Sequence, residues 1–129
     1  MSLKAFIVED NVSIRDSLVE TLRELIGITT AGVAASEKAA VSWLNDPANQ
    51  WDFAIVDLIL ESGGSGLGVL SACRNRAAGR KMVVLTGNAN PDVRRHCMAL
   101  GCDKVFDKAM DTDALIAWCA DLARQFGDN

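Results

Sequence analysis

The chain has 129 residues, of which 50% are hydrophobic and 23% charged, with a formal net charge of −4 at pH 7. This length fits one domain, and this composition excludes a disordered chain. The acidic balance argues against direct nucleic-acid binding, and no apolar run reaches the roughly 18 residues of a membrane span. We therefore expect a single cytoplasmic domain over residues 1–129, with no direct contact to nucleic acid or membrane.

The cysteines form no metal-binding pattern. Cys73, Cys97, Cys102 and Cys119 include no Cys-x-x-Cys pair, and His96 is the single histidine of the chain. A zinc site would need closely spaced Cys or His ligands. We expect four reduced packing residues and a solvated histidine.

The first half of the chain alternates β-like runs with helical patterns. The run 4–8 lacks polar alternation, as in a strand buried on both faces of a parallel sheet, whereas 28–34 is a weaker run of Thr, Val and small residues. Asn11 or Ser13 can cap the first helix and Ser36 the second, and Gly27 can end the first one. The expected elements are a strand at 4–8, a helix from 11 to about 26, a strand at 28–34 and a helix from 36 to about 44.

The second half repeats this alternation. The buried run Phe53–Val56 ends abruptly on Asp57, and a loop rich in Ser and Gly follows. Asn90 and Pro91 form a helix start with proline at the first helical position. The expected elements are a strand at 53–57, a helix from about 67 to 75, a strand at 81–86, a helix from about 91 to 100, a strand at 104–107 and a last helix from 111 or 112.

Five strand–helix units in sequence predict an α/β fold. Such alternation gives a doubly wound parallel sheet with right-handed crossovers and helices on both faces. The flavodoxin-like (β/α)5 architecture, with strand order 2-1-3-4-5, is typical of five such units. Because this fold hosts many functions, the function must be read from particular residues.

Polar residues stand at the carboxyl ends of four of the five strands. Glu9 and Asp10 follow the first, Asp57 the third and Lys108 the fifth, while Thr86 ends the fourth. The carboxyl ends of parallel strands meet at one edge of a sheet, so we expect these groups to converge. Three neighbouring carboxylates repel one another unless a cation neutralises them, and Mg²⁺ prefers such oxygen ligands.

These residues stand in motifs that resemble the receiver domain of two-component response regulators. The resemblance covers essentially the whole chain, through the segments 6–10, 55–58, 83–87 and 101–108. It implies a phosphoacceptor signalling domain, not a metabolic enzyme, that catalyses only its own phosphorylation and dephosphorylation. The implied partner is a sensor histidine kinase or a histidine phosphotransferase, and the last two helices with the last strand could form a homodimer.

The resemblance also implies a role for each polar residue at the strand ends. Asp57 would be the phosphoacceptor. The Thr86 hydroxyl would donate a hydrogen bond to the bound phosphoryl group, and the Lys108 ammonium group would form an ion pair with it. Mg²⁺ would be bound directly by Asp10, Asp57 and the backbone carbonyl of Ile59, and through water by Glu9. Phosphoryl transfer consists mostly of positioning and charge stabilisation, which agrees with this set of groups.

Three positions depart from the family pattern. Glu61 and Ala109 stand where proline is usual, and Val105 stands where an aromatic residue is expected. Adjacent strand residues face opposite sides of a sheet. We therefore expect Phe106 to pack under a helix and Val105 to face the surface of the last two helices, so that switching does not depend on an aromatic side chain at position 105.

Two alternative interpretations belong to other classes. A hydrolase of the haloacid-dehalogenase type also uses a strand-end Asp with Mg²⁺. That family resembles Asp-x-Asp, in which the second Asp is the general acid, whereas Ile59 is the second residue after Asp57 in this chain. A pseudo-receiver would only bind partners, and the complete set of acidic, hydroxyl and lysine groups argues against it. Turnover of a phosphate ester would favour the hydrolase, and stoichiometric labelling the receiver.

Overall fold

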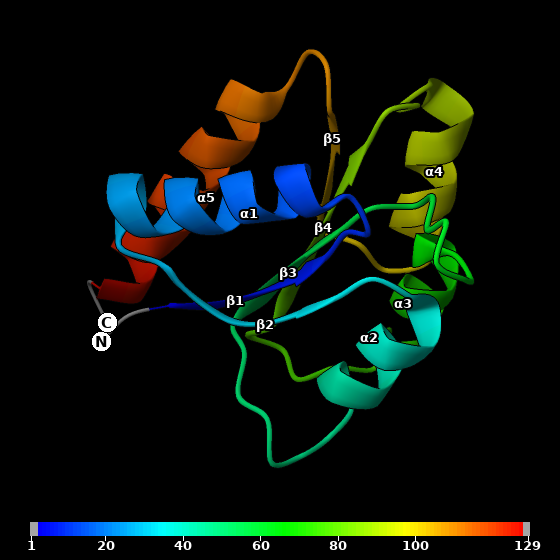
Figure 1. Cartoon of the computed structure of the whole chain (residues 1–129), viewed down its shortest axis with the longest axis horizontal. Coiled ribbons are helices and arrows are strands. Elements are labelled where there is room, and N and C mark those ends of the chain that lie inside the picture. Colours follow the sequence, from blue (N-terminus) through cyan, green and yellow to red (C-terminus); the bar gives the residue numbers. More distant parts are fainter. Residues whose placement is uncertain (1–2, 128–129) are drawn as a thin grey trace.

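The strands form one parallel sheet in a computed structural model that describes residues 3–127. The strand order is β2-β1-β3-β4-β5, which confirms the predicted flavodoxin-like fold (Figure 1). The five strands are β1 (Lys4–Val8), β2 (Thr29–Ala34), β3 (Phe53–Val56), β4 (Lys81–Thr86) and β5 (Lys104–Asp107).

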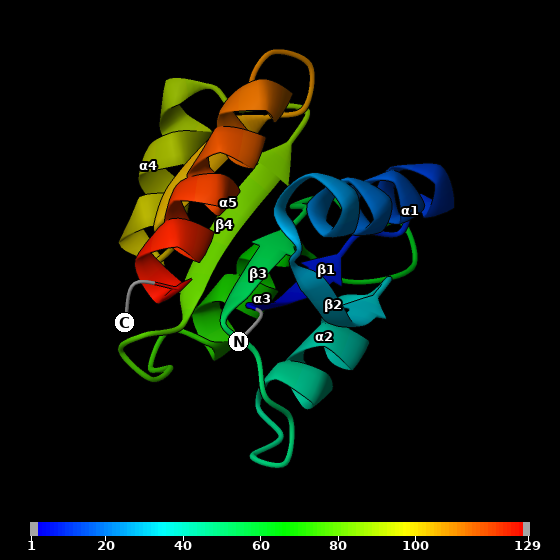
Figure 2. The same ribbon diagram turned by 90° about the vertical axis from the view of Figure 1, so that its left-hand side faces the viewer.

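Helices cover both faces of this sheet (Figures 1 and 2). Helices α1 and α5 pack on one face, and α2, α3 and α4 pack on the other. Asn11, Ser36 and Asn90 accept the capping hydrogen bonds that the sequence predicts. The helices are α1 (Val12–Thr21), α2 (Glu37–Leu44), α3 (Gly66–Ala72), α4 (Pro91–Ala99) and α5 (Thr112–Gly127), with a π-helical turn, η1 (Leu22–Ile26), after α1.

The first helical segment ends where the sequence predicts, whereas α3 ends earlier than predicted. The helix expected from 11 to about 26 finishes with the wider η1 turn, and Gly27 ends it with a φ of 77°, in the left-handed region that favours glycine. Helix α3 ends at Ala72, three residues before the predicted end at Asn75. There the chain turns back, because the Arg76 N–H donates to the carbonyl of Cys73 at 3.2 Å.

The core consists of two apolar layers, one on each face of the sheet. Trp43 stacks on Phe6 with ring centroids 4.3 Å apart, and Trp51 is buried. The four cysteines are free and buried, and His96 is exposed, as predicted. Burial raises the pKa of Cys102 and of Cys119 to about 12, so these thiols stay protonated. Within residues 3–127, no helix is long and apolar enough to cross a membrane.

Strand β5 corrects one prediction and confirms another. Phe106 packs with Leu115 and Cys119 of α5, as expected. Val105 is not at the surface but buried, in the opposite layer. Its side chain lies in the apolar layer that contains Cys97 of α4, and the Arg94 guanidinium group donates to the Val105 carbonyl at 2.9 Å.

Candidate functional site

The backbone beyond three strand ends continues the hydrogen bonding of the sheet. The Glu9 N–H donates to the carbonyl of Ala34 at 3.0 Å, and the Asp57 N–H to that of Val8 at 2.9 Å. The Lys108 N–H donates to the carbonyl of Thr86 at 2.9 Å. These bonds extend the ladder by one residue, so the first polar residue after each strand is held in a defined position.

Three carboxylates meet at this edge of the sheet. Carboxylate oxygens of Glu9, Asp10 and Asp57 all lie within 4.8 Å of one another. The exposed fractions of Glu9 and Asp57 are only 2% and 6%, whereas Asp10 is partly exposed. A pocket of about 310 Å³ opens over them, and its walls are Glu9, Asp10, Asn11, Asp57, Ile59, Glu61, Gly87 and Lys108. Larger pockets lie elsewhere on the surface, but their walls carry no such cluster of carboxylates.

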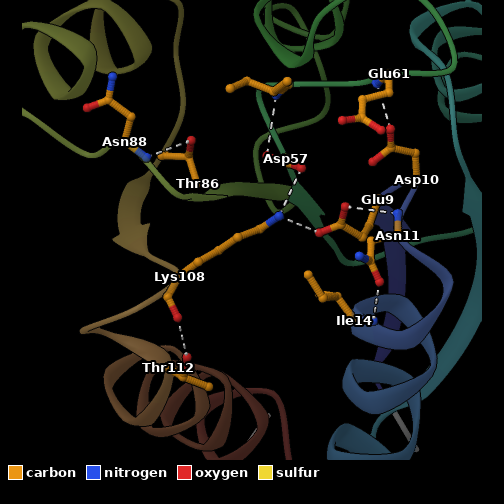
Figure 3. A network of polar contacts seen from close by, with 11 residues as sticks. Glu9, Asp10, Asn11, Ile14, Asp57, Glu61, Thr86, Asn88, Lys108 and Thr112 are labelled. Atoms are coloured by element: carbon orange, nitrogen blue, oxygen red, sulfur yellow. Dashed lines mark hydrogen bonds and ion pairs between the residues drawn. The ribbon is translucent and has the colours of Figure 1, made fainter.

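A backbone N–H orients each of these carboxylates (Figure 3). Asn11 donates to Glu9 Oε2 and Ile59 donates to Asp57 Oδ1, both at 3.3 Å. The third bond is shorter, since the Glu61 N–H donates to Asp10 Oδ2 at 2.6 Å. The carboxylates are therefore positioned before any ligand binds.

Lys108 is the cation of the site. Its Nζ lies 2.7 Å from Glu9 Oε1 and 3.0 Å from Asp57 Oδ2. Burial by itself would lower the pKa of Lys108, but the hydrogen bonds and negative charges of these two carboxylates outweigh it and raise the pKa above its ordinary value. Burial also raises the pKa of Glu9, and the charge of Asp57 adds to this effect.

The charges of the site do not balance. Three carboxylates face one ammonium group in the pocket. Oxygen ligands with excess negative charge are the set that a hard divalent cation prefers. The cluster therefore fits Mg²⁺, in agreement with the sequence prediction of a magnesium site.

Thr86 lies apart from this cluster. It is buried at the end of β4, and its Oγ1 accepts a hydrogen bond from the Asn88 N–H at 3.4 Å. In Figure 3 the hydroxyl lies beside Asn88 and not beside Asp57. The structure thus brings together Glu9, Asp10, Asp57, Ile59 and Lys108 of the predicted set in one pocket, whereas Thr86 is not among the residues that line it.

Sequence reasoning missed three residues that line the pocket, Asn11, Glu61 and Gly87. Glu61 was singled out for the proline it replaces, but not as a hydrogen-bond donor to Asp10. The signal was present, because every residue except proline has a backbone N–H. What the sequence could not show is that this N–H reaches a carboxylate 51 residues earlier in the chain.

The fold and the pocket define an open α/β protein with an acidic pocket at the carboxyl edge of its parallel sheet. A model of the response regulator receiver domain family matches residues 5–120. The chain therefore belongs to the receiver domain family of two-component response regulators, whose function is to accept a phosphoryl group. Among curated protein sequences, none matches this chain.

Solved structures of receiver domains share the fold. The receiver domain of the Francisella response regulator 1452 has 22% identity and a TM-score of 0.79, with 97% of this chain and 99% of that chain covered. The signal receiver domain of a DNA-binding response regulator from Colwellia psychrerythraea 34H has 20% identity and a TM-score of 0.82, with coverages of 95% and 99%. The phosphorylated cyanobacterial phytochrome response regulator RcpA has 21% identity and a TM-score of 0.77, with coverages of 95% and 91%.

At these identities the likeness shows the fold alone, and membership of the family rests on the sequence match. Receiver domains bind Mg²⁺ at an acidic pocket, and they interact with histidine kinases or phosphotransfer proteins. The acidic cluster of Glu9, Asp10 and Asp57 is the corresponding feature in this chain.

Proposed function

We propose that Asp57 is the phosphoacceptor of this receiver domain and takes its phosphoryl group from a phosphohistidine of a sensor histidine kinase or histidine phosphotransferase. One observation supports this choice above all. Asp57 is a buried carboxylate at the end of the central strand β3, oriented by the Ile59 N–H and paired with Lys108. It is the carboxylate of the cluster that combines these contacts with a central position.

The transfer exchanges one bond to phosphorus for another. An Asp57 oxygen forms a P–O bond as the P–N bond to the donor imidazole breaks, and the leaving nitrogen keeps the bonding electron pair. Lys108 is already 3.0 Å from Asp57 Oδ2, so its ammonium group can follow the negative charge onto the phosphoryl oxygens. The Thr86 hydroxyl would leave Asn88 and donate to the same oxygens.

The chain's residues would hold Mg²⁺ through Asp10, Asp57 and the backbone carbonyl of Ile59, with Glu9 acting through a water molecule. A bound Mg²⁺ supplies the positive charge that three carboxylates and one lysine lack, and it screens the incoming phosphoryl group from the Asp57 carboxylate. Glu9 and Asp57 also share Lys108, so binding of the cation would relieve their mutual repulsion.

The test is phosphorylation with a small donor. Purified protein is incubated with acetyl phosphate and Mg²⁺, and its intact mass is measured with time. The expected result is one phosphoryl group per chain in the wild type and none in Asp57→Asn or after removal of Mg²⁺ by EDTA. Asp57→Asn labelled at the wild-type rate would contradict the assignment, and continuous turnover of a phosphate ester would favour the hydrolase interpretation.

Two further features are part of the proposal. The domain is expected to hydrolyse its own phosphoaspartate, as the family resemblance implies, and the apolar Ile59 side chain is expected to make this hydrolysis slow. A homodimer through α4, β5 and α5 remains a prediction, tested by sedimentation of the protein before and after phosphorylation.

A further inference from the structure

The loop between β3 and α3 makes a direct contact with the acidic cluster. The Glu61 N–H donates to Asp10 Oδ2 at 2.6 Å, a short bond between groups 51 residues apart (Figure 3). Hydrogen bonds to an ionised carboxylate are shorter and stronger than neutral ones. Lys108 pairs with Glu9 and Asp57, so the Glu61 bond supplies the third carboxylate with a donor of its own.

The donor is held in place from the other side of its loop. Glu37, the first residue of α2, donates its N–H to the Gly63 carbonyl at 3.1 Å and accepts the Ser65 N–H on its carboxylate at 2.9 Å. Gly64 packs directly against the Glu37 side chain, where a Cβ would collide with it. The loop is therefore fastened to α2 at one end and to Asp10 at the other.

The identity of residue 61 decides whether this contact can exist. Proline has no N–H to donate, so a proline at position 61 would leave Asp10 without this bond. Any other residue at position 61 keeps the donor, whatever its side chain. The carboxylate of Glu61 is a separate feature, because it stands exposed in the wall of the acidic pocket.

We propose that the Glu61 N–H is a positioning donor for Asp10, which sets this carboxylate for a divalent cation and couples the occupancy of the metal site to the loop fastened on α2. The inference rests on the proposed function, in which Asp10 is a metal ligand. The donor occupies Oδ2 and leaves Oδ1 available to the cation. Removal of a group that orients a metal ligand in this way commonly weakens metal binding by 10- to 100-fold.

The first test compares two substitutions at one position. Glu61→Ala removes the carboxylate and keeps the N–H, whereas Glu61→Pro removes both, so the difference between them measures the N–H. Each protein is titrated with MgCl₂ by calorimetry at constant ionic strength, without a phosphoryl donor. The expected result is that Glu61→Pro binds Mg²⁺ about 10-fold or more weakly than Glu61→Ala. Equal affinities of the two variants would overturn the inference.

The second test observes the donor itself and does not require the proline variant to fold. Exchange of the Glu61 amide hydrogen is measured by NMR without metal in the wild type, Asp10→Asn and Asp10→Ala. Asn retains an oxygen acceptor and Ala does not, so protection is expected to survive in Asp10→Asn and to fall at least 10-fold in Asp10→Ala. An amide that exchanges equally fast in all three proteins would overturn the inference.

The same variants separate this inference from the proposed metal site. Wild-type affinity for Mg²⁺ in Asp10→Ala would overturn the metal site and the inference together. Loss of binding in Asp10→Ala with equal affinities in Glu61→Pro and Glu61→Ala would leave the metal site standing and overturn only the positioning role.

Discussion

The two edges of the sheet use charged residues in opposite ways. At the amino edge, Arg76 and Asp103 form an ion pair at 2.9 Å, and Asp103 also accepts the Met82 N–H at 2.8 Å. The Arg76 guanidinium group makes further hydrogen bonds to backbone carbonyls, those of Cys73, Arg80 and Gly101. One positive and one negative group thus neutralise each other and fasten the ends of α3 and α4 to the sheet.

The carboxyl edge has no such balance. Among the described residues, three carboxylates cluster there, those of Glu9, Asp10 and Asp57, and Lys108 pairs with Glu9 and Asp57 but not with Asp10. The same residue types are present at both edges, so composition does not distinguish them. The difference lies in the ratio of positive to negative groups. At the amino edge each charge has a partner of opposite sign, whereas the excess of carboxylates at the carboxyl edge can bind a cation. The following predictions test this contrast, from the largest expected effect to the smallest.

Removal of the cation at the amino edge is expected to destabilise the fold. Arg76→Met leaves Asp103 and several carbonyls without their donor, and should lower the free energy of unfolding by about 2–3 kcal/mol. Urea denaturation measures the effect. The matched control is Arg74→Met, since Arg74 is exposed, and it should stay within about 0.5 kcal/mol of the wild type. Equal effects of the two substitutions would contradict a structural role for the Arg76 pair.

Removal of one carboxylate at the other edge is expected to act in the opposite direction. In EDTA and at low ionic strength, Asp10→Asn should raise the free energy of unfolding by about 1 kcal/mol, because it relieves like-charge repulsion. Saturating Mg²⁺ should stabilise the wild type and not Asp10→Asn, since a ligand stabilises the state that binds it. Thermal unfolding with and without Mg²⁺ checks both parts. A less stable Asp10→Asn in EDTA would show that the carboxyl edge is as balanced as the amino edge.

The lifetime of the phosphoryl group tests access of water to the carboxyl edge. By the family resemblance, Ile59 borders the path of the hydrolytic water, and its apolar side chain has no group to orient water. The phosphoaspartate of Ile59→Asn should therefore be hydrolysed several-fold faster than that of the wild type. A tenfold faster rate would correspond to a hydrolysis barrier lower by about 1.4 kcal/mol. The measurement is decay of the phosphorylated mass after removal of the donor at constant Mg²⁺, with Ile59→Val as the control. Equal decay of Ile59→Asn and the wild type would show that this side chain does not limit hydrolysis.

The smallest effect is expected at β5. Phe106 is buried under α5, and Val105 is buried in the opposite apolar layer. The Val105 carbonyl accepts a hydrogen bond from Arg94, which also pairs with Asp111. We predict that Phe106 remains buried when the domain is phosphorylated. A structure with beryllofluoride bound would check this, and a Phe106 side chain that turns outward would contradict it.

Much of the fold and of the site follows from residue types alone. Buried strands show as apolar runs, and helix ends show as Asn, Ser and Gly, because these signals are local. The polar residues that follow the strands converge because parallel strands all end at one edge. For this reason Glu9, Asp10, Asp57 and Lys108 could be placed in one site without coordinates, whereas Ile59 was added by the family resemblance.

Tertiary structure decided the contacts that depend on the path of the chain. Val105 is buried because its side chain packs in the apolar layer that contains Cys97 of α4, and the Thr86 hydroxyl accepts the Asn88 N–H. The Glu61 N–H reaches Asp10 because Glu37 fastens the intervening loop to α2. A backbone N–H has the same chemistry at every position except proline, so residue type cannot reveal its direction. Only the folded chain determines which carboxylate such a group meets.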